Sequence, residues 1–382
     1  MDINRFTKQS PGRLVEVSHP IRDHAFVPDP LPPRWEFPSR LWPLLVSARE
    51  RLAELNGISR ALPNPELLLT PLQRREALAS STLEGTYATP EQVLLFELRD
   101  ETEREEREPA PWREVFNYRT ALREGHNFLQ DGPLSQFLIR RLHEWLMEGV
   151  WGQAGRPGAY RDSQVYIGSD RRFIPPPVDF LEDCLTAIEE TLQAGPGEVD
   201  PLVYCYLVHY QFETIHPFTD GNGRVGRLLL ALMTARECNL AMPWLYMSSF
   251  FEKHKDEYVD RLFSVNRKGD WTSWVEFCLR GTEEQAADSI RRSDRLKELH
   301  EEMQLRASSG SGRLHRIVDY LFYSPVVTAP YLQKVLDVSP PTARADIERL
   351  VNLGILKRSG EQKHPMVFYA PAIWEIVFET LD

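Results

Sequence analysis

Residues 216–227 read His-Pro-Phe-Thr-Asp-Gly-Asn-Gly-Arg-Val-Gly-Arg and combine a histidine, a carboxylate, three glycines and two arginines. The residues that follow, 228–233, form an apolar run that predicts a buried helix. The loop therefore lies at the N-terminus of that helix, where free N–H groups and the helix dipole favour anions. This arrangement predicts a binding site for a phosphate-bearing ligand.

Each residue type in this loop has a chemical use. Glycines allow tight turns and let backbone N–H groups approach an anion. Arg224 and Arg227 share one helix face, so both can reach the outer phosphates. Asp220 supplies the hard oxygen that Mg²⁺ takes while it bridges phosphates. His216 is the only group in the loop that can accept a proton near neutral pH.

Each feature alone also has an ordinary structural explanation. A histidine before proline, arginines on a helix and a Gly-Asn-Gly turn are all common, but their joint occurrence in one short loop favours a functional site. The spacing matches neither the P-loop nor the dinucleotide-binding glycine pattern, so these two phosphate sites are excluded on residue type.

Composition restricts the class of protein. The 382-residue chain carries 45 basic and 56 acidic residues and a net charge of −11, which argues against a protein that coats nucleic acid or anionic membrane. Residues 1–6 lack the core of a signal peptide, and no apolar run is long enough to span a membrane. We therefore expect a cytoplasmic protein. The cysteines lie singly in apolar stretches and are expected to be reduced core residues: Cys184, Cys205, Cys238 and Cys278.

The loop resembles the signature of the Fic family, His-x-Phe-x-Asp/Glu-Gly-Asn-Gly-Arg-x-x-Arg, and meets every fixed position of it. Residues 207–215 also resemble the helix that precedes the family's loop. Fic proteins mostly transfer AMP from ATP to a Ser, Thr or Tyr hydroxyl of a target protein, with Mg²⁺ and release of pyrophosphate. The resemblance covers roughly residues 20–300 and implies a mainly α fold, a Fic-type helical bundle.

The resemblance assigns roles to single residues. His216 would take the proton of the attacking hydroxyl, and Asp220 would hold Mg²⁺. Arg224 would contact the β-phosphate and Arg227 the γ-phosphate. The nucleotide-binding set is completed by Gly221, Asn222, Gly223, Val225 and Gly226.

Three further residues complete this interpretation. Lys253 lies where related proteins place another nucleotide contact. Tyr258 either lines the base pocket or belongs to the core. Phe218 is expected to pack the loop on the core and not to touch the ligand.

A second motif precedes the loop, on a helix predicted over residues 71–84. Gly85 fits a C′ cap, which places Glu84 in the last helical turn, where the dipole disfavours an anion. Residues 89–92, Thr-Pro-Glu-Gln, then predict the start of another helix. An exposed, tolerated glutamate is the simple explanation of Glu84. The stretch also resembles the Fic inhibitory motif, Ser/Thr-x-x-x-Glu-Gly/Asn, with Ser80 and Glu84 on its fixed positions; in that subgroup the glutamate pairs with the second arginine, here Arg227.

A β-hairpin is predicted between residues 161 and 177. Residues 164–167 and 172–174 favour strands, and the segment between them favours a turn. A surface connection is the alternative, but the resemblance implies a flap that aligns the backbone of the target as an added strand.

The sequence predicts four parts. Residues 1–130 would form an N-terminal arm and a helical region with the inhibitory helix, 71–85. Residues 131–305 would form the Fic catalytic domain, and 306–312 a Ser/Gly-rich linker. Residues 313–382 predict three helices and two strands, the arrangement of a winged-helix module. In the first part, residues 27–33 are proline-rich and cannot be helical, and the charged residues 99–108 are expected to be a solvated helix end or loop.

The function expected from these observations is that of an autoinhibited protein adenylyltransferase with ATP as substrate and Mg²⁺ as cofactor. Removal of AMP, transfer of another nucleotide or phosphate group, and a winged-helix transcription regulator with a vestigial Fic domain stay open. Residues 311–382 hold eight basic and eight acidic side chains, which gives little affinity for phosphates of nucleic acid. The expected partner is a target protein; self-modification and a homodimer stay open, and a membrane is not expected.

Overall fold

The computed structural model describes residues 1–18, 22–61, 65–98, 111–150, 156–168, 172–308, 311–360 and 365–379. This part of the chain is mainly helical, as predicted. None of its helices is long and apolar enough to cross a membrane. The charged stretch 99–108 lies outside the described residues.

The helices of the described residues are α1 (Trp42–Ala61), α2 (Glu66–Leu83), α3 (Pro90–Glu97), α5 (Pro111–Phe128), α6 (Gln136–Met147), α7 (Val178–Ala194), α8 (Pro201–Ile215), α9 (Asn222–Glu237), α10 (Ser248–Lys253), α11 (Lys255–Lys268), α12 (Trp271–Ala307), α13 (Gly312–Tyr323), α14 (Ala329–Leu336), α15 (Pro340–Asn352) and α16 (Pro371–Phe378), with short 3-10 turns at Ile3–Arg5 and Ser39–Leu41. The strands are β1 (Gly12–Val17), β2 (Asp23–Pro28), β3 (Val326–Thr328), β4 (Lys357–Arg358) and β5 (Val367–Tyr369).

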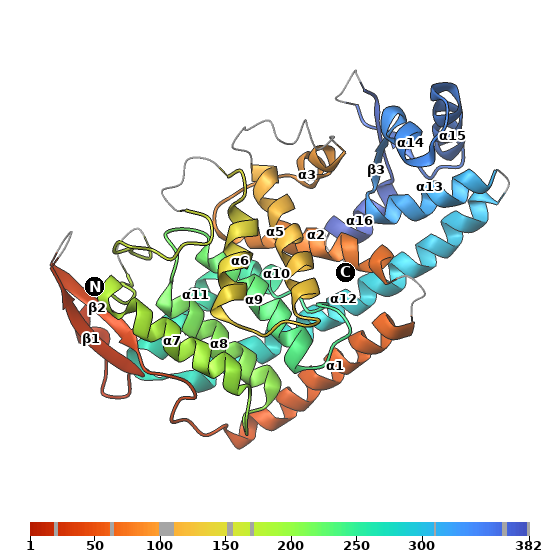
Figure 1. The fold of residues 1–382 in the computed structure, drawn as a ribbon. Helices are drawn as coiled ribbons and strands as arrows, with labels where there is room; N and C mark the ends of the chain where they lie inside the picture. The colour runs from red at the N-terminus through yellow and green to blue at the C-terminus, as the bar shows by residue number, and fades with distance from the viewer. Residues whose placement is uncertain are drawn as a thin grey trace.

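Helices α8 and α9 form the centre of the bundle. They pack against each other, and residues 222–235 of α9 are all buried. Helices α5 and α6 cover α9, while α7, α11 and α12 pack on α8. The loop of residues 216–221 therefore joins the two central helices, α8 and α9 (Figure 1).

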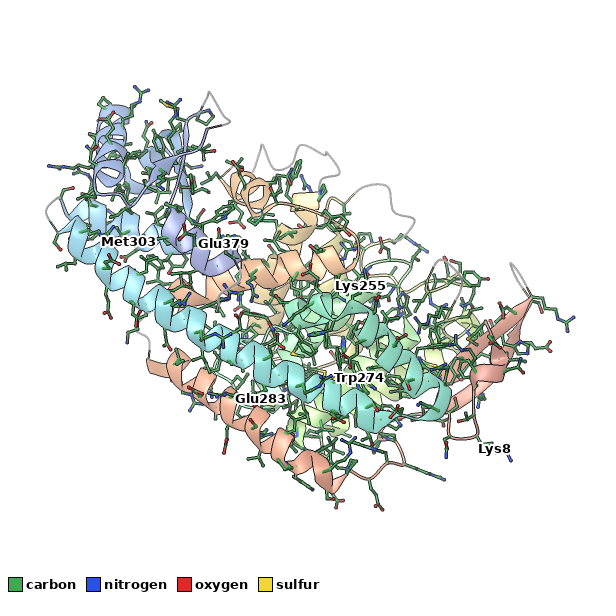
Figure 2. All side chains as sticks on the ribbon, turned by 180° about the vertical axis from the view of Figure 1, so that it is seen from behind. Lys8, Lys255, Trp274, Glu283, Met303 and Glu379 are labelled. Carbon is green, nitrogen blue, oxygen red and sulfur yellow. The ribbon has the colours of Figure 1, made fainter. Side chains whose placement is uncertain are left out.

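The long helix α12 connects the two ends of the molecule. Figure 2 shows α1 running beside it, with Trp274, Glu283 and Met303 placed along its length. Before α12, residues 248–268 form two shorter helices, α10 and α11. The break before α12 follows from Gly269, at φ +65°, and from Asp270, whose side chain accepts from the N–H of Ser273 as an N-cap.

The N-terminal arm contains a hairpin that the sequence analysis missed. Strands β1 and β2 pair antiparallel, with Gly12 opposite Pro28. A side chain at Gly12 would lie 2.4 Å from the carbonyl oxygen of Val27, so only glycine fits there. The N–H of Phe26 also donates to the carbonyl of Ile174 at 2.9 Å, which joins β2 to the segment predicted as the flap.

The predicted flap contains less regular structure than expected. Ile167 and Phe173 form one isolated antiparallel bridge, and the turn residues 169–171 lie outside the described residues. Residues 175–177 are prolines without N–H donors, which explains why the pairing does not extend along this side.

The C-terminal elements follow the predicted order. The three helices expected here correspond to α13, α14 and α15, and a three-stranded sheet in the order β3-β5-β4 replaces the two strands expected. Strand β3 and helix α16 were not predicted. Figure 1 shows this group at the end opposite to the β1–β2 hairpin, with α13 and α16 packed against α2. Residues 309–310 of the linker lie outside the described part.

Candidate active site

The loop between α8 and α9 begins and ends at residues with a left-handed backbone conformation. His216 caps α8 in the left-handed region, at φ 51°, and Gly221 begins α9 at φ +76°. The side chain of Asn222 closes the loop because it accepts from the N–H of Phe218 and donates to its carbonyl, both at 2.8 Å. Its side chain is thus structural, while the first N–H groups of α9 have no partner within their own helix.

His143 supports the same loop, although no sequence motif marked it. The N–H of Gly158 donates to His143 Nδ1 at 2.9 Å, so the ring proton resides on Nε2, which lies 3.2 Å from the carbonyl of Asp220. Its ring stacks on Phe218 with the centroids 3.9 Å apart. Burial lowers the pKa of His143 to about 4, so the ring is neutral near neutral pH. Phe218 is fully buried, in accordance with its expected packing role.

His216 is oriented by two contacts. Its Nδ1 lies 3.3 Å from the carbonyl of Glu213, which can only accept, so the proton resides on Nδ1 and Nε2 keeps its lone pair. Buried Arg161 donates to the carbonyl of His216 at 2.9 Å and to that of Pro176 at 2.5 Å. Burial lowers the pKa of His216 to about 4, although the Glu84 carboxylate opposes this shift. The ring is therefore neutral, in the form that accepts a proton.

Arg227 is held by residues at the C-terminal end of α2, the helix predicted to be inhibitory. Its Nη2 donates to Glu84 Oε1 at 2.8 Å and to the carbonyl of Ser80 at 2.9 Å, and its Nε donates to Ser80 Oγ at 2.9 Å. Burial disfavours the charged forms of both Arg227 and Glu84. The Glu84 carboxylate nevertheless raises the pKa of Arg227, and Arg227 lowers the pKa of Glu84. Both residues of the second motif thus contact the last arginine of the loop.

Glu84 lies at two helix ends at once. It is the C-cap of α2, and the N–H groups of Gly85 and Thr86 bond to the carbonyls of Thr82 and Ser81 as in a Schellman motif. A side chain at Gly223 would lie 2.1 Å from Glu84 Oε1, so the carboxylate lies directly over the first turn of α9. The dipole of α2 disfavours the Glu84 carboxylate at the C-terminal end of that helix, but the N-terminal end of α9 favours it, so the two effects offset each other. The sequence predicted only the first of these effects.

Arg224 has a carboxylate partner of its own, Glu114 of α5, which the sequence analysis missed. Arg224 Nη1 donates to Glu114 Oε2, and Thr86 Oγ1 donates to the same oxygen at 3.0 Å. Asp220 lies further away, with its Oδ1 3.7 Å from Arg224 Nη2. Both arginines of the loop are therefore paired with acids from the N-terminal helical region.

A cavity of about 230 Å³ opens beside the loop, and its lining includes His216, Gly223 and Arg227. Glu213 also faces this cavity, and its Oε1 is buried without a hydrogen-bond partner. Burial raises the pKa of Glu213 to about 8, with Glu84 adding to the shift and Arg227 opposing it. A side chain at Gly226 would lie 2.2 Å from this oxygen, so Gly226 leaves room for Glu213.

The other candidate residues differ in whether they line this cavity. Tyr258 lines the cavity and its hydroxyl lies 3.0 Å from His209 Nε2, whereas Val225 is a core residue. Lys253 does not line this cavity; it is exposed and pairs with Glu284 at 2.6 Å. Lys255 lines the cavity instead and donates to the carbonyl of Leu83 at 2.7 Å. Of the two lysines in this segment, Lys255 and not Lys253 therefore lines the cavity.

Asp220 is the residue that fits a magnesium ion. In the described part of the chain, no three His, Cys, Asp or Glu side chains gather as a metal cage. The Asp220 side chain is 42% exposed and accepts from the N–H of Gly221 at 2.6 Å. One exposed carboxylate suits an ion that takes its other ligands from phosphates and water.

Two families match adjacent parts of the chain. Residues 42–127 match the family described as Fic/DOC family N-terminal, and residues 133–234 match the Fic/DOC family. A probable protein adenylyltransferase of Aquifex aeolicus is 32% identical over 185 residues, which is 46% of this chain and 57% of that protein. The protein adenylyltransferase Fic of Nematostella vectensis is 35% identical over 127 residues, 33% of this chain and 27% of that protein. The chain thus covers less than two thirds of either relative.

A solved structure agrees in fold. A Fic family protein from Desulfovibrio desulfuricans G20 superposes with a TM-score of 0.54 at 21% identity, over 88% of this chain and 98% of that one. At this identity the likeness concerns the fold alone. The two matched segments contain the loop, the helix with Ser80 and Glu84, and the Arg224 partner Glu114. The chain is therefore similar to the Fic/DOC family over residues 42–127 and 133–234.

Proposed function

We propose that this chain is a protein adenylyltransferase that transfers AMP from ATP to a Ser, Thr or Tyr hydroxyl of a protein. The observation that carries this proposal is the geometry of His216. Its Nδ1 is occupied by the carbonyl of Glu213, and it lines the same cavity as Gly223 and Arg227 at the start of α9. A base and an anion-binding helix N-terminus thus face one cavity, which is what attack on a phosphate requires.

The proposed reaction uses His216 as the general base. Nε2 takes the proton of the target hydroxyl while the hydroxyl oxygen forms a bond to the α-phosphorus. The bond between the α-phosphorus and the oxygen that bridges to the β-phosphate breaks, and pyrophosphate leaves with that electron pair. The N–H groups at the start of α9, with Arg224 and Arg227, bind the phosphates and the charge that develops on them. Magnesium held by Asp220 would neutralise phosphate charge when bound.

We further propose that Glu84 inhibits this reaction. Its carboxylate lies over Gly223 and pairs with Arg227, so it competes with phosphate for the same arginine and the same helix N-terminus. The hydrogen bonds from Arg227 to Ser80 support this state. Removal of AMP is the second candidate, because Glu84 lines the cavity beside His216 and could position a water molecule there.

The remaining assignments are also proposals. We infer that the segment 164–174 is the flap that aligns the target, supported by its place in the lining of the cavity through Ile167 and Phe173. We infer that residues 313–382 form a winged-helix module that binds a protein, or a second copy of this chain, more tightly than DNA, with cytoplasmic location and self-association as further expectations. Tight, sequence-specific DNA binding by the full chain in a gel shift would contradict this inference.

The reaction is tested by label position. The protein is incubated with Mg²⁺, a cell lysate and ATP labelled on the α-phosphate or on the γ-phosphate, and the products are identified by mass spectrometry. Transfer of AMP predicts protein labelling from the α-label only, and strongly reduced labelling with His216→Ala. Labelling from the γ-phosphate would indicate phosphate transfer, and loss of AMP from a modified protein would favour the second candidate.

A further inference from the structure

A second cavity, of about 610 Å³, lies where the inhibitory helix α2 meets α5, α13 and α14. It shares no lining residue with the cavity beside His216. Arg74 of α2, Arg119 of α5 and Glu97 of α3 line it, together with Tyr320 and Tyr331 from the C-terminal elements. Its volume lies within the range of small-molecule sites.

Arg74 and Arg119 form a local excess of positive charge in this cavity, whose lining also includes Glu66 and Arg123. Arg74 Nη2 lies 2.6 Å from Glu97 Oε2, and Arg119 Nη1 lies 2.8 Å from Glu97 Oε1, so two guanidinium groups share one carboxylate. Arg74 is 1% exposed, and its Nη1 is buried without a hydrogen-bond partner. Glu66 also lines the cavity, but among the described contacts it pairs with neither arginine.

An excess positive charge in a buried place is unfavourable unless an anion accompanies it. The environment of Arg119 agrees with this excess: burial lowers the pKa of Arg119, Glu97 opposes the shift, and the nearby Arg74 lowers the pKa further. The planar guanidinium group is also the side chain best suited to an oxyanion, because it donates two parallel hydrogen bonds. The cavity therefore has the chemistry of an anion site.

We propose that this cavity binds a small molecule that carries a phosphate or another oxyanion, with the oxyanion between Arg74 and Arg119. The rings of Tyr320 and Tyr331, whose centroids are 5.1 Å apart, form a wall against which the rest of the molecule would pack. Phosphate in this position would balance the second guanidinium group.

Occupancy of this site would be transmitted to the Fic loop. Arg74 Nη2 also donates to the carbonyl of Tyr323 at 2.9 Å, which ties α2 to α13. The same helix carries Ser80, which bonds to Arg227. A ligand that bridges Arg74 and Arg119 would stabilise α2 in its observed position and so strengthen inhibition. This consequence rests on the proposed function, whereas the binding site does not.

The site is tested by titration of the full chain with inorganic phosphate at constant ionic strength. Binding is measured by calorimetry and by the shift of the melting temperature. We expect saturable binding in the millimolar range or tighter. Arg119→Gln should weaken it about ten-fold or more, because a charge-assisted hydrogen bond to the anion is lost. Arg74→Gln should have the same effect. Since Arg74 is fully buried, Arg119, with its side chain 19% exposed, provides the variant that should remain folded.

Two control variants separate this site from its surroundings. Arg75→Gln removes the same charge from the next position of α2, but Arg75 pairs with Asp288 and lines a different cavity, so phosphate binding should persist. Arg224→Gln removes an arginine of the Fic loop and should also leave this binding in place. No saturable binding, or binding that Arg224→Gln abolishes and Arg119→Gln does not change, would overturn the proposal. Binding without any effect on AMP transfer would overturn only the link to the Fic loop.

Discussion

Replacement of Glu84 by glycine removes the carboxylate that pairs with Arg227. The hydrogen bond is 2.8 Å long, Arg227 is 2% exposed and the Glu84 side chain is 36% exposed. A charged hydrogen bond contributes ~1.5–3 kcal/mol. Because Glu84 is partly exposed, solvent screening weakens this hydrogen bond, and we take the lower limit of that free-energy range. About 1.4 kcal/mol corresponds to a factor of ten, so AMP transfer by Glu84→Gly should be about ten-fold faster.

The assay is the initial rate of self-modification with ATP labelled on the α-phosphate. Glu84→Gln is the matched variant, because it keeps the size of the side chain, removes the charge and should give a smaller increase. Arg227→Ala in the Glu84→Gly background should abolish the gain. Ser80 keeps its own bonds to Arg227 after the change, so Ser80→Ala should add to the gain. Unchanged or slower labelling by folded Glu84→Gly would refute autoinhibition and favour a water-positioning role for Glu84.

Three further outcomes are expected. His216→Ala should retain ATP binding in calorimetry and lose about 10²–10⁴-fold in transfer rate; transfer at the original rate would exclude His216 as the base. Burial lowers the pKa of His216 to about 4 and the Glu84 carboxylate opposes this shift, so removal of Glu84 should not raise the pKa, and the rate of Glu84→Gly should stay flat from neutral pH down to about one unit above that value; a decrease centred near the ordinary histidine pKa would contradict this shift. Glu114→Gln leaves Arg224 without its charged partner and should raise the KM for ATP in the Glu84→Gly background. Thr86→Val removes only the hydroxyl bond to Glu114 and should change this KM less. Equal KM values in the two variants would argue against a positioning role for Glu114.

Much of the local structure could be predicted because its causes are local. Gly85 at φ +85° and the capping box of Thr89 and Gln92 lie where their residue types placed them. The hairpin of β1 and β2 was missed because its strands are short and are supported by partners far along the chain, such as Ile174. The residues that complete the site were missed for the same reason: His143, Arg161 and Glu114 carry no motif, and each acts through a contact across the fold.

The sequence by itself determined the chemistry of the loop, because a base, an acid, glycines and two arginines lie within one turn and the start of one helix. It also determined where α2 ends, since a glycine that adopts positive φ stops a helix by local sterics. Only the tertiary structure decided that Glu84 lies over the start of α9 and that Arg224 pairs with Glu114. It also decided that Lys255, and not Lys253, faces the cavity. These contacts join segments far apart in the sequence, and their geometry depends on how α2, α5, α9 and α11 pack, which no local pattern of residues specifies.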